Sequence, residues 1–131
     1  MTEDSVRPSQ ILIRKKKRQL ELLYSNLESF SLSFEYLRVN SPSAEVRGHN
    51  PKEEKLQHGK KNVGISKINR VGNYAIQLVF DDDHNSGIYS WEYLRYLGIN
   101  KESLWSKYLK RLSEEGLSRD PNEQVLNLKF N

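Results

Sequence analysis

Cysteine is absent from the 131 residues of the sequence. Without thiols the chain has no disulfides, no thiolate metal sites, no iron–sulfur ligation and no cysteine nucleophile. Long apolar runs are also missing, because none approaches the roughly 18 residues needed to span a membrane. The N-terminal stretch MTEDSVRPSQ is polar and shows no signal peptide. We therefore expect a soluble, cytoplasmic protein that does not associate with membranes.

Catalytic signatures are likewise scarce. The sequence contains no G-x-S-x-G elbow, no Walker loop and no G-x-G-x-x-G motif. Its three histidines are His49, His58 and His84, and none begins the His-x-Asp or His-x-Glu triplet of a non-haem iron site. The glutamates fall mostly in a charged loop or on helix faces, so no acid–base pair is indicated. We expect that the chain is not an enzyme.

Positive charge is present in modest excess and is concentrated in one run. The formal net charge is +4 and the pI is about 9.3. The run comprises Arg14, Lys15, Lys16, Lys17 and Arg18. Such a run can bind phosphates or nucleic acid, or it can be the solvated end of a hairpin, and we favour the hairpin. No RNP, KH or zinc-finger signature is present, so nucleic acid is not the expected partner.

The sequence also contains nearly the same hexapeptide twice. SFEYLR occupies residues 33–38 and SWEYLR occupies residues 90–95, with five of the six letters identical. Short strand-like runs separated by turn residues precede each copy. The pattern predicts an α+β fold of two ββ(β)α repeats with mainly antiparallel strands. Repeat one is expected over residues 9–40 and repeat two over residues 63–98, packed about a pseudo-twofold axis.

Each hexapeptide is predicted to begin a short helix. Ser33 and Ser90 are placed to cap the helix N-termini. The aromatic residue and the leucine of each hexapeptide lie three positions apart and are expected to face the sheet. Gly98 is expected to end the second helix. Gly72 and Asn73 predict a tight turn between two strands of the second repeat.

Three further segments flank or join the repeats. Residues 1–8 are predicted to form a disordered tail. Residues 41–62 are predicted to form a long loop, because they are rich in proline, glycine and charge. Residues 99–131 are predicted to form an amphipathic C-terminal helix and a tail that pack on the domain. The alternating end of the tail, QVLNLKF, predicts either an edge strand or a strand that pairs with a partner.

The C-terminal helix is expected over residues 101–115. Its apolar residues recur with helical spacing, which predicts one buried stripe. Asn100 is placed to cap its N-terminus. Gly116 is expected to stop it, as a glycine just past a helix commonly does.

Two motifs in the chain resemble a known family. They are LRVNSPSAEVRGH at residues 37–49 and DDHNSGIYSW at residues 82–91. Together they resemble the gamma-butyrobetaine hydroxylase-like N-terminal domain family, and the resemblance covers residues 9–98. The small stand-alone bacterial members of that family are largely of unknown function. The resemblance therefore implies a fold and does not imply an activity.

The resemblance also implies a metal position that this chain has largely lost. In the hydroxylases the domain precedes an iron- and 2-oxoglutarate-dependent catalytic domain, and it carries a zinc ion bound by three cysteines and one histidine. The cysteine positions fall on Ser41, Ser43 and Val46, and the histidine falls on His84. Serine hydroxyls stay protonated at neutral pH and valine has no donor atom, so a tetrahedral zinc site is not rebuilt there. We expect neither zinc nor iron as a cofactor.

The loop that follows the first hexapeptide is the expected binding element. Its polar side chains join those of the second hairpin turn in a predicted ligand- or partner-binding set: Glu45, Arg47, His49, Asp82 and His84. The alternative is that Glu45 and Arg47 pair with Arg38 or Glu35 and only hold the loop in place.

The sequence supports three hypotheses for function. The leading one is a non-catalytic accessory or interaction domain, specifically an adaptor for an iron–sulfur or redox-related protein partner. It rests on the repeat, the missing catalytic signatures and the lost cysteine positions. The adaptor role is implied by relatives in which the domain resembles an appendage to P-loop iron–sulfur carrier ATPases. The second is a weak metal-binding protein or small enzyme centred on His84. The third is phosphate or nucleic-acid binding through residues 14–18. The oligomeric state is expected to be a monomer or a homodimer.

Overall fold

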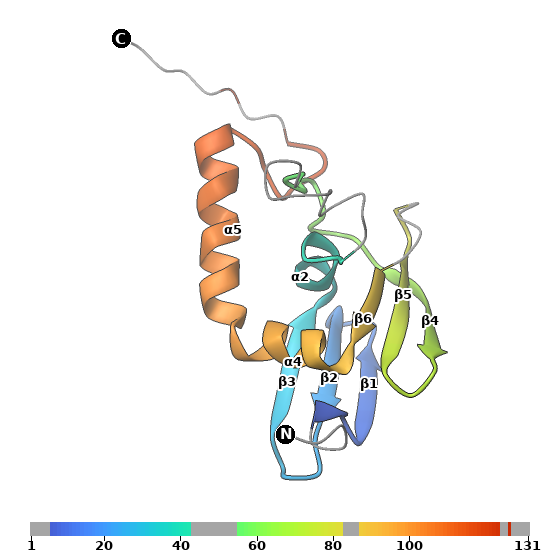
Figure 1. The fold of residues 1–131 in the computed structure, drawn as a ribbon. Coiled ribbons are helices and arrows are strands. Elements are labelled where there is room, and N and C mark those ends of the chain that lie inside the picture. Colours follow the sequence, from blue (N-terminus) through green and yellow to red (C-terminus); the bar gives the residue numbers. More distant parts are fainter. Residues whose placement is uncertain (1–5, 43–54, 83–86, 124–125, 127–131) are drawn as a thin grey trace.

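Two three-stranded antiparallel sheets, each followed by a helix, form the body of the protein. The structure is a computed structural model, and it describes residues 6–42, 55–82, 87–123 and 126. The strands are β1 (Gln10–Arg14), β2 (Gln19–Leu23), β3 (Ser29–Ser33), β4 (Ile65–Val71), β5 (Ala75–Phe80) and β6 (Gly87–Ser90). The helices are α2 (Phe34–Val39), α4 (Trp91–Ile99) and α5 (Lys101–Glu115) (Figure 1). The predicted α+β class with antiparallel strands and a C-terminal helix is confirmed.

The two halves of the chain have the same element order. The first sheet has the strand order β1-β2-β3 and the second has the order β4-β5-β6. The registers correspond, because Leu20 lies opposite Leu32 in the first sheet and Ile76 lies opposite Tyr89 in the second. In both halves a helix follows the third strand directly. The predicted repeat requires this order of strands and helix in each half. That the two halves are copies of one unit stays an interpretation.

The core is built from alternating apolar residues of the two central strands. Leu20 and Leu22 of β2 are fully buried, and so is Leu78 of β5. Successive side chains of a strand point to opposite faces, so each sheet turns one apolar face inward. The helices α2 and α4 pack against β3, and α4 also packs against β6. Val6, which lies within the segment 1–8, also contributes to this core.

Hydrogen bonds cross between the two helices that carry the hexapeptides. The Tyr36 hydroxyl of α2 donates to the carbonyl oxygen of Leu97 in α4 at 2.7 Å. The Tyr93 hydroxyl of α4 donates to the carbonyl oxygen of Asn40, just after α2, at 2.6 Å. Tyr36 and Tyr93 hold the same place in the two hexapeptides, and each reaches the residue four positions past the tyrosine of the other. The two halves are therefore joined by reciprocal contacts.

Serine caps begin both helices, as predicted. The Ser33 hydroxyl accepts a hydrogen bond from the backbone N–H of Tyr36 at 2.9 Å. The Ser90 hydroxyl accepts one from the backbone N–H of Tyr93 at 3.1 Å. Each contact satisfies an N–H group that has no partner within the helix. The hexapeptide therefore encodes the corner at which a strand becomes a helix.

Gly98 lies inside α4, which continues to Ile99, so the prediction that Gly98 ends this helix is wrong. The reason is packing against β3. A Cβ atom at Gly98 would lie 2.5 Å from Cγ of Phe30, which is closer than carbon atoms approach without a shift. Glycine is thus present because the Phe30 ring occupies the space that a larger side chain would need.

The C-terminal helix α5 begins at Lys101 and stops before Gly116, as predicted. Gly116 has a φ of +66°, the left-handed conformation that favours glycine at a helix end. The Asn100 side chain makes no capping hydrogen bond to α5; its Nδ2 donates to the carbonyl oxygen of Tyr96 at 2.9 Å and so satisfies the end of α4. That capping prediction is wrong.

In the figure α5 runs along the left side of the molecule, and α2 lies to its right, above the strands of the first sheet (Figure 1). Within the described residues, no helix has both the length and the apolar character that crossing a membrane requires. The predicted C-terminal strand falls almost wholly outside the described residues.

Candidate functional site

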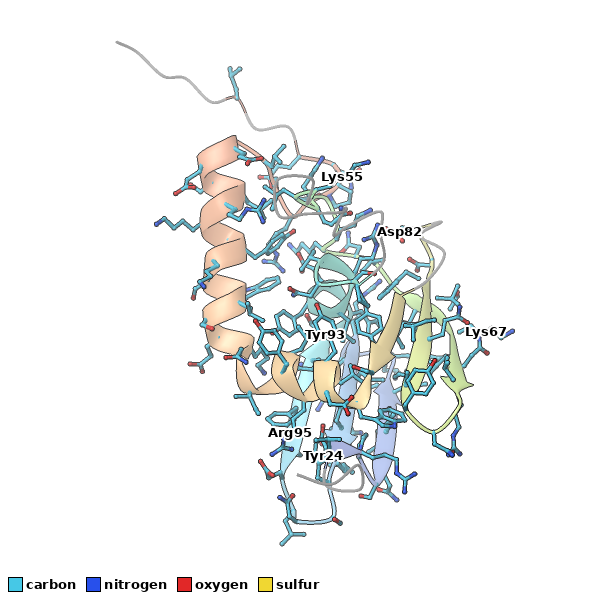
Figure 2. All side chains as sticks on the ribbon, viewed as in Figure 1. Tyr24, Lys55, Lys67, Asp82, Tyr93 and Arg95 are labelled. Atoms are coloured by element: carbon cyan, nitrogen blue, oxygen red, sulfur yellow. The ribbon has the colours of Figure 1, made fainter. Side chains whose placement is uncertain are left out.

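An ion-pair cluster surrounds Asp82, the described member of the predicted binding set. Asp82 follows the end of β5, and its Oδ2 accepts from Nε of Arg38 at 3.0 Å and from Nζ of Lys60 at 2.6 Å (Figure 2). Arg38 ends the first hexapeptide, and its side chain is only 6% exposed. The guanidinium also lies 6.0 Å from the centre of the Phe80 ring. One carboxylate oxygen thus receives hydrogen bonds from two cations.

The electrostatics of this cluster favour an ionised carboxylate. Burial raises the pKa of Asp82, but the hydrogen bonds and charges of Lys60 and Arg38 outweigh it, so the pKa lies below its ordinary value. Among the ion pairs of the described residues, two cations face one anion here, so these three side chains together carry a positive charge. Nη1 of Arg38 is buried and has no hydrogen-bond acceptor among the described residues. A carboxylate held in this way is a weak base, because protonation would break both ion pairs.

Ser41 is the described member of the positions that the resemblance assigns to zinc ligands. It is fully buried. A Cβ atom on Gly87 would lie 2.7 Å from its Oγ, so Ser41 and the start of β6 are tightly packed. Nearby, the Tyr89 hydroxyl donates to the carbonyl oxygen of Leu37 at 2.5 Å, and burial raises the pKa of that hydroxyl.

These residues do not fit a zinc ion. Ser41 supplies a neutral hydroxyl in place of a thiolate, and the nearby Asp82 is already neutralised by Arg38 and Lys60. A divalent cation beside two positive side chains would be repelled. Among residues 6–42, 55–82 and 87–123, no group of three or more histidine or acidic side chains is arranged to hold a metal ion.

The remaining predicted site residues lie outside the described part of the chain. These are Glu45, Arg47, His49 and His84, together with the former cysteine positions Ser43 and Val46. Their placement beside Asp82 stays a prediction. Arg38 and Glu35, the residues that the alternative interpretation assigns as partners of this loop, both have ion-pair partners in the structure. Arg38 pairs with Asp82, and Glu35 pairs with Arg119.

A second cluster forms where the other hexapeptide ends. Nη2 of Arg95 lies 2.9 Å from Oε1 and 3.1 Å from Oε2 of Glu28. The Arg95 guanidinium also lies 5.1 Å from the centre of the Tyr24 ring and 5.9 Å from that of Phe30 (Figure 2). The arginine of each hexapeptide therefore pairs with an acidic residue of the other half. Arg38 pairs with Asp82 after β5, and Arg95 pairs with Glu28 after β2. Lys60 has no counterpart at Arg95 among the described contacts, which makes the Asp82 cluster the more positive of the two.

The basic run forms the end of the β1–β2 hairpin, which is the interpretation favoured from the sequence. Arg14 closes β1 and its Nε pairs with Oε2 of Glu21 at 2.8 Å. Arg18 has a φ of +56° and its guanidinium donates to the carbonyl oxygen of Asn62. The three intervening residues, Lys15, Lys16 and Lys17, are exposed. Phosphate or nucleic-acid binding through this run stays a prediction.

Sequence reasoning did not identify a composite surface at the C-terminal end of α5. We call it the α5 face and define it as residues 55–61, the C-terminal half of α5 and residues 116–123. Backbone hydrogen bonds join its two irregular segments: Gly59 N–H donates to Ser118 O at 2.8 Å, and Lys61 N–H donates to Arg119 O at 3.0 Å. Neither segment shows periodicity in the sequence, so no pattern predicts that they meet.

A bidentate ion pair fastens the α5 face to the core. Nε of Arg119 lies 2.8 Å from Oε2 of Glu35, and its Nη2 lies 2.7 Å from Oε1. The guanidinium also stacks over Trp105 of α5, 5.1 Å from the ring centre. The Tyr108 hydroxyl donates to the carbonyl oxygen of Gln57 at 2.9 Å and so ties α5 to the first segment. The face is thus held by charged, aromatic and polar contacts together.

Several concave regions open on the α5 face. One, of about 420 Å³, lies between residues 58–59 and 116–123. A second, of about 460 Å³, is lined by Lys61, the end of α5 and residues 117–120. A third, of about 200 Å³, lies between residues 55–57, the end of α2 and the middle of α5. Three concave regions thus gather at one end of the molecule, which makes this end a candidate for binding.

The sequence of this chain matches one known family of proteins. The family described as gamma-butyrobetaine hydroxylase-like, N-terminal, matches residues 11–95. The chain belongs to this family. The matched part of this gamma-butyrobetaine hydroxylase-like domain includes both sheets except for Gln10, both hexapeptides and Asp82, but not α5. Family membership therefore covers the Asp82 cluster and only part of the α5 face.

Solved structures resemble the chain over most of its length. One NMR solution structure is 47% identical, with a TM-score of 0.78, over 94% of this chain and 97% of the other. A second is 45% identical, with a TM-score of 0.74, over all of this chain and 98% of the other. A crystal structure of a DUF971-family protein of unknown function from Acidithiobacillus ferrooxidans ATCC 23270 is 34% identical, with a TM-score of 0.62, over 74% of this chain and 98% of the other. Among curated proteins no match was found.

Proposed function

We propose that this gamma-butyrobetaine hydroxylase-like domain is a non-catalytic accessory protein that binds a protein partner through its α5 face. The observation that carries the proposal is the bidentate Glu35–Arg119 pair, which fixes the segment 116–123 to α2. Backbone hydrogen bonds from Gly59 and Lys61 join the segment 55–61 to it. Ordered irregular segments that surround concave regions are typical of binding surfaces, because loops on a rigid scaffold carry function more often than regular elements do.

The chemistry of the Asp82 cluster supports a binding role over a catalytic one. A general base must be free to accept a proton, whereas the Asp82 carboxylate is engaged by Arg38 and Lys60. The buried Tyr89 hydroxyl is committed to the Leu37 carbonyl oxygen. These polar groups therefore maintain the structure, and their net positive charge suits contact with an acidic surface.

The finer part of the proposal concerns the partner. We place the protein in the cytoplasm as an adaptor for an iron–sulfur or redox-related protein. The support is the resemblance to domains appended to P-loop iron–sulfur carrier ATPases, and the loss of all three cysteine positions, which leaves partner binding as the remaining shared property.

Site-specific photocrosslinking in the native host tests the binding surface. A photoreactive amino acid at Ser113, exposed on the α5 face, should give one discrete adduct with a second protein. The same group at Lys67, exposed on β4 at the far side of the molecule, should give none (Figure 2). Equal adducts from both positions, or no adduct from Ser113, would contradict the proposal.

A further inference from the structure

A small cavity on the α5 face combines an apolar floor with positively charged walls. We call it the α5 pocket. Its volume is about 200 Å³. It lies where the end of α2, residues 55–57 and the middle of α5 meet. The residues that line it include Lys55, Leu56, Leu104, Lys107, Tyr108 and Arg111.

Hydrogen bonds hold the walls of the α5 pocket in place. The Tyr108 hydroxyl donates to the Gln57 carbonyl oxygen at 2.9 Å. Burial, chiefly, raises the pKa of Tyr108, so this hydroxyl keeps its proton and stays a donor. The Asn40 side chain donates from Nδ2 to the carbonyl oxygen of Tyr36 at 2.9 Å. The pocket is therefore preformed and does not require a ligand for its shape.

Among the described residues, the charged side chains that line the α5 pocket all carry a positive charge. They are Lys55, Lys107 and Arg111, and no acidic side chain lies with them in that part of the chain. Within residues 6–42, 55–82 and 87–123, neither Lys55 nor Lys107 has an ion-pair partner. Lys107 and Arg111 are one helical turn apart on α5, so both project on the same side of the helix. An anionic group placed here would meet the two lysines, Lys55 and Lys107, together.

The floor of the α5 pocket decides which anion suits it. Tyr108 is 8% exposed, and Leu104 packs against the core. A phosphate would place oxygens against Leu56 and Leu104 without hydrogen-bond partners, which is unfavourable. A carboxylate on a hydrocarbon stem would bury its stem against the floor and keep its charge at the rim.

Size decides between a small-molecule cofactor and a side chain. Pockets for drug-sized ligands and cofactors are usually about 300–1,000 Å³. The α5 pocket is smaller than this and is large enough for one or two side chains. We propose that it receives a glutamate side chain, next to an aliphatic residue, from the protein partner. This inference rests on the proposed function and specifies what the partner contributes.

NMR titration of the full, ¹⁵N-labelled chain tests the assignment. The probe is a blocked tetrapeptide of alternating leucine and glutamate, and the matched control peptide has glutamine in place of glutamate. The acidic peptide should shift the signals of Lys107, Tyr108 and Leu56 and leave those of β4 unchanged. The glutamine peptide should bind about tenfold more weakly, since hydrogen bonds to charged groups are the stronger ones.

A matched pair of variants on α5 distinguishes binding in the pocket from nonspecific electrostatic attraction of the peptide to the protein. Lys107→Gln removes a cation from the pocket. Lys110→Gln removes the same charge from a side chain that is 77% exposed and does not line the pocket. We expect about tenfold weaker binding of the acidic peptide by the first variant and less than a twofold change by the second.

Several outcomes would overturn the inference. Equal losses in both variants would show nonspecific attraction, and equal binding of both peptides would show that the cations play no part. Glutarate ions that shift the same signals as strongly as the peptide would identify a free acid as the ligand. If the acidic peptide causes no shifts at millimolar concentration, the pocket does not bind a partner's glutamate. The same result is expected if acidic side chains of this chain already occupy it. If the peptide fails but Ser113 still crosslinks, the pocket assignment falls and the proposed function stands.

Discussion

Glu35 and Glu92 occupy the same place in the two hexapeptides, but Glu35 is 5% exposed and Glu92 is on the surface. The difference comes from Arg119, which reaches Glu35 from the C-terminal segment and forms two hydrogen bonds of 2.8 and 2.7 Å with its carboxylate. The glutamate of the repeated hexapeptide is thus a buried ion-pair partner in the first half and a solvent-exposed side chain in the second.

Neutralising the buried glutamate should destabilise the protein, while neutralising the exposed one should not. Glu35→Gln removes the charge that pairs with Arg119 and should lower the free energy of unfolding by about 1–3 kcal/mol. Glu92→Gln should change it by no more than about 0.5 kcal/mol. Urea unfolding of both variants measures the difference. Equal effects would show that the Glu35–Arg119 pair contributes nothing beyond a surface contact.

The Asp82 cluster should make stability depend on pH at the acid end. The folded-state pKa of Asp82 is lowered, so its contribution is fully present above the unfolded value of about 3.9. It is lost as the pH falls through the folded-state pKa. Asp82→Asn should cost about 1–3 kcal/mol at neutral pH, and its difference from the native chain should shrink below about pH 4.

Chemical unfolding of both chains between neutral pH and pH 3 measures this dependence. Glu28→Gln serves as a control, because its carboxylate is more exposed and its ion pair with Arg95 is better screened. Its effect on stability should be smaller than that of Asp82→Asn. A difference between native chain and Asp82→Asn that stays constant through acid pH would refute a role for the Asp82 charge.

Zinc should not stabilise the protein, because a bound ion would have to displace Arg38 and Lys60 from Asp82. Thermal unfolding with and without added zinc should give the same Tm. A rise in Tm that disappears in His84→Ala would instead favour the metal-binding hypothesis centred on His84.

Removing the crossed tyrosine hydroxyls should weaken the contact between the two halves. Tyr36→Phe leaves the Leu97 carbonyl without its donor, and Tyr93→Phe does the same to the Asn40 carbonyl. Each change should cost about 1 kcal/mol, with the larger loss at Tyr36, which is more deeply buried. Tyr74→Phe, at an exposed turn, should have little effect. Calorimetry would contradict this account if all three variants unfolded at the native temperature.

Gly98→Ala should destabilise α4 although alanine is the better helix former. The added methyl group would collide with the Phe30 ring and should cost about 1–3 kcal/mol, more than the roughly 1 kcal/mol gained in helix propensity. A second substitution, Phe30→Leu, should recover part of the loss by clearing that space. A stabilised Gly98→Ala variant would show that the ring moves aside freely.

Local features of the fold were predictable because short-range physical chemistry determines them. Ser33 and Ser90 cap helices through backbone groups three residues away, and the hexapeptide contains all the atoms involved. Gly98 was misinterpreted for the opposite reason. Its role depends on Phe30, which is distant in the chain, and glycine at a helix end is locally just as plausible.

The candidate site was harder to predict because its partners are distant in sequence. The polar turn after the strand predicts Asp82 as a site residue. The sequence around Lys60 does not indicate that Lys60 pairs with Asp82, which is 22 positions away. Glu35 and Arg119 are 84 positions apart. Neither separation produces a period or a motif, so only the folded arrangement shows the α5 face.

The reciprocal bonds of Tyr36 and Tyr93 have a consequence for how the chain can be divided. A cut between residues 42 and 55 would yield two fragments, each with a complete sheet and hexapeptide helix. Each fragment would carry one donor and one acceptor of the crossed pair, so neither could satisfy its own tyrosine. Each fragment would supply the acceptor for the tyrosine hydroxyl of the other. We therefore expect the two fragments to associate when they are mixed.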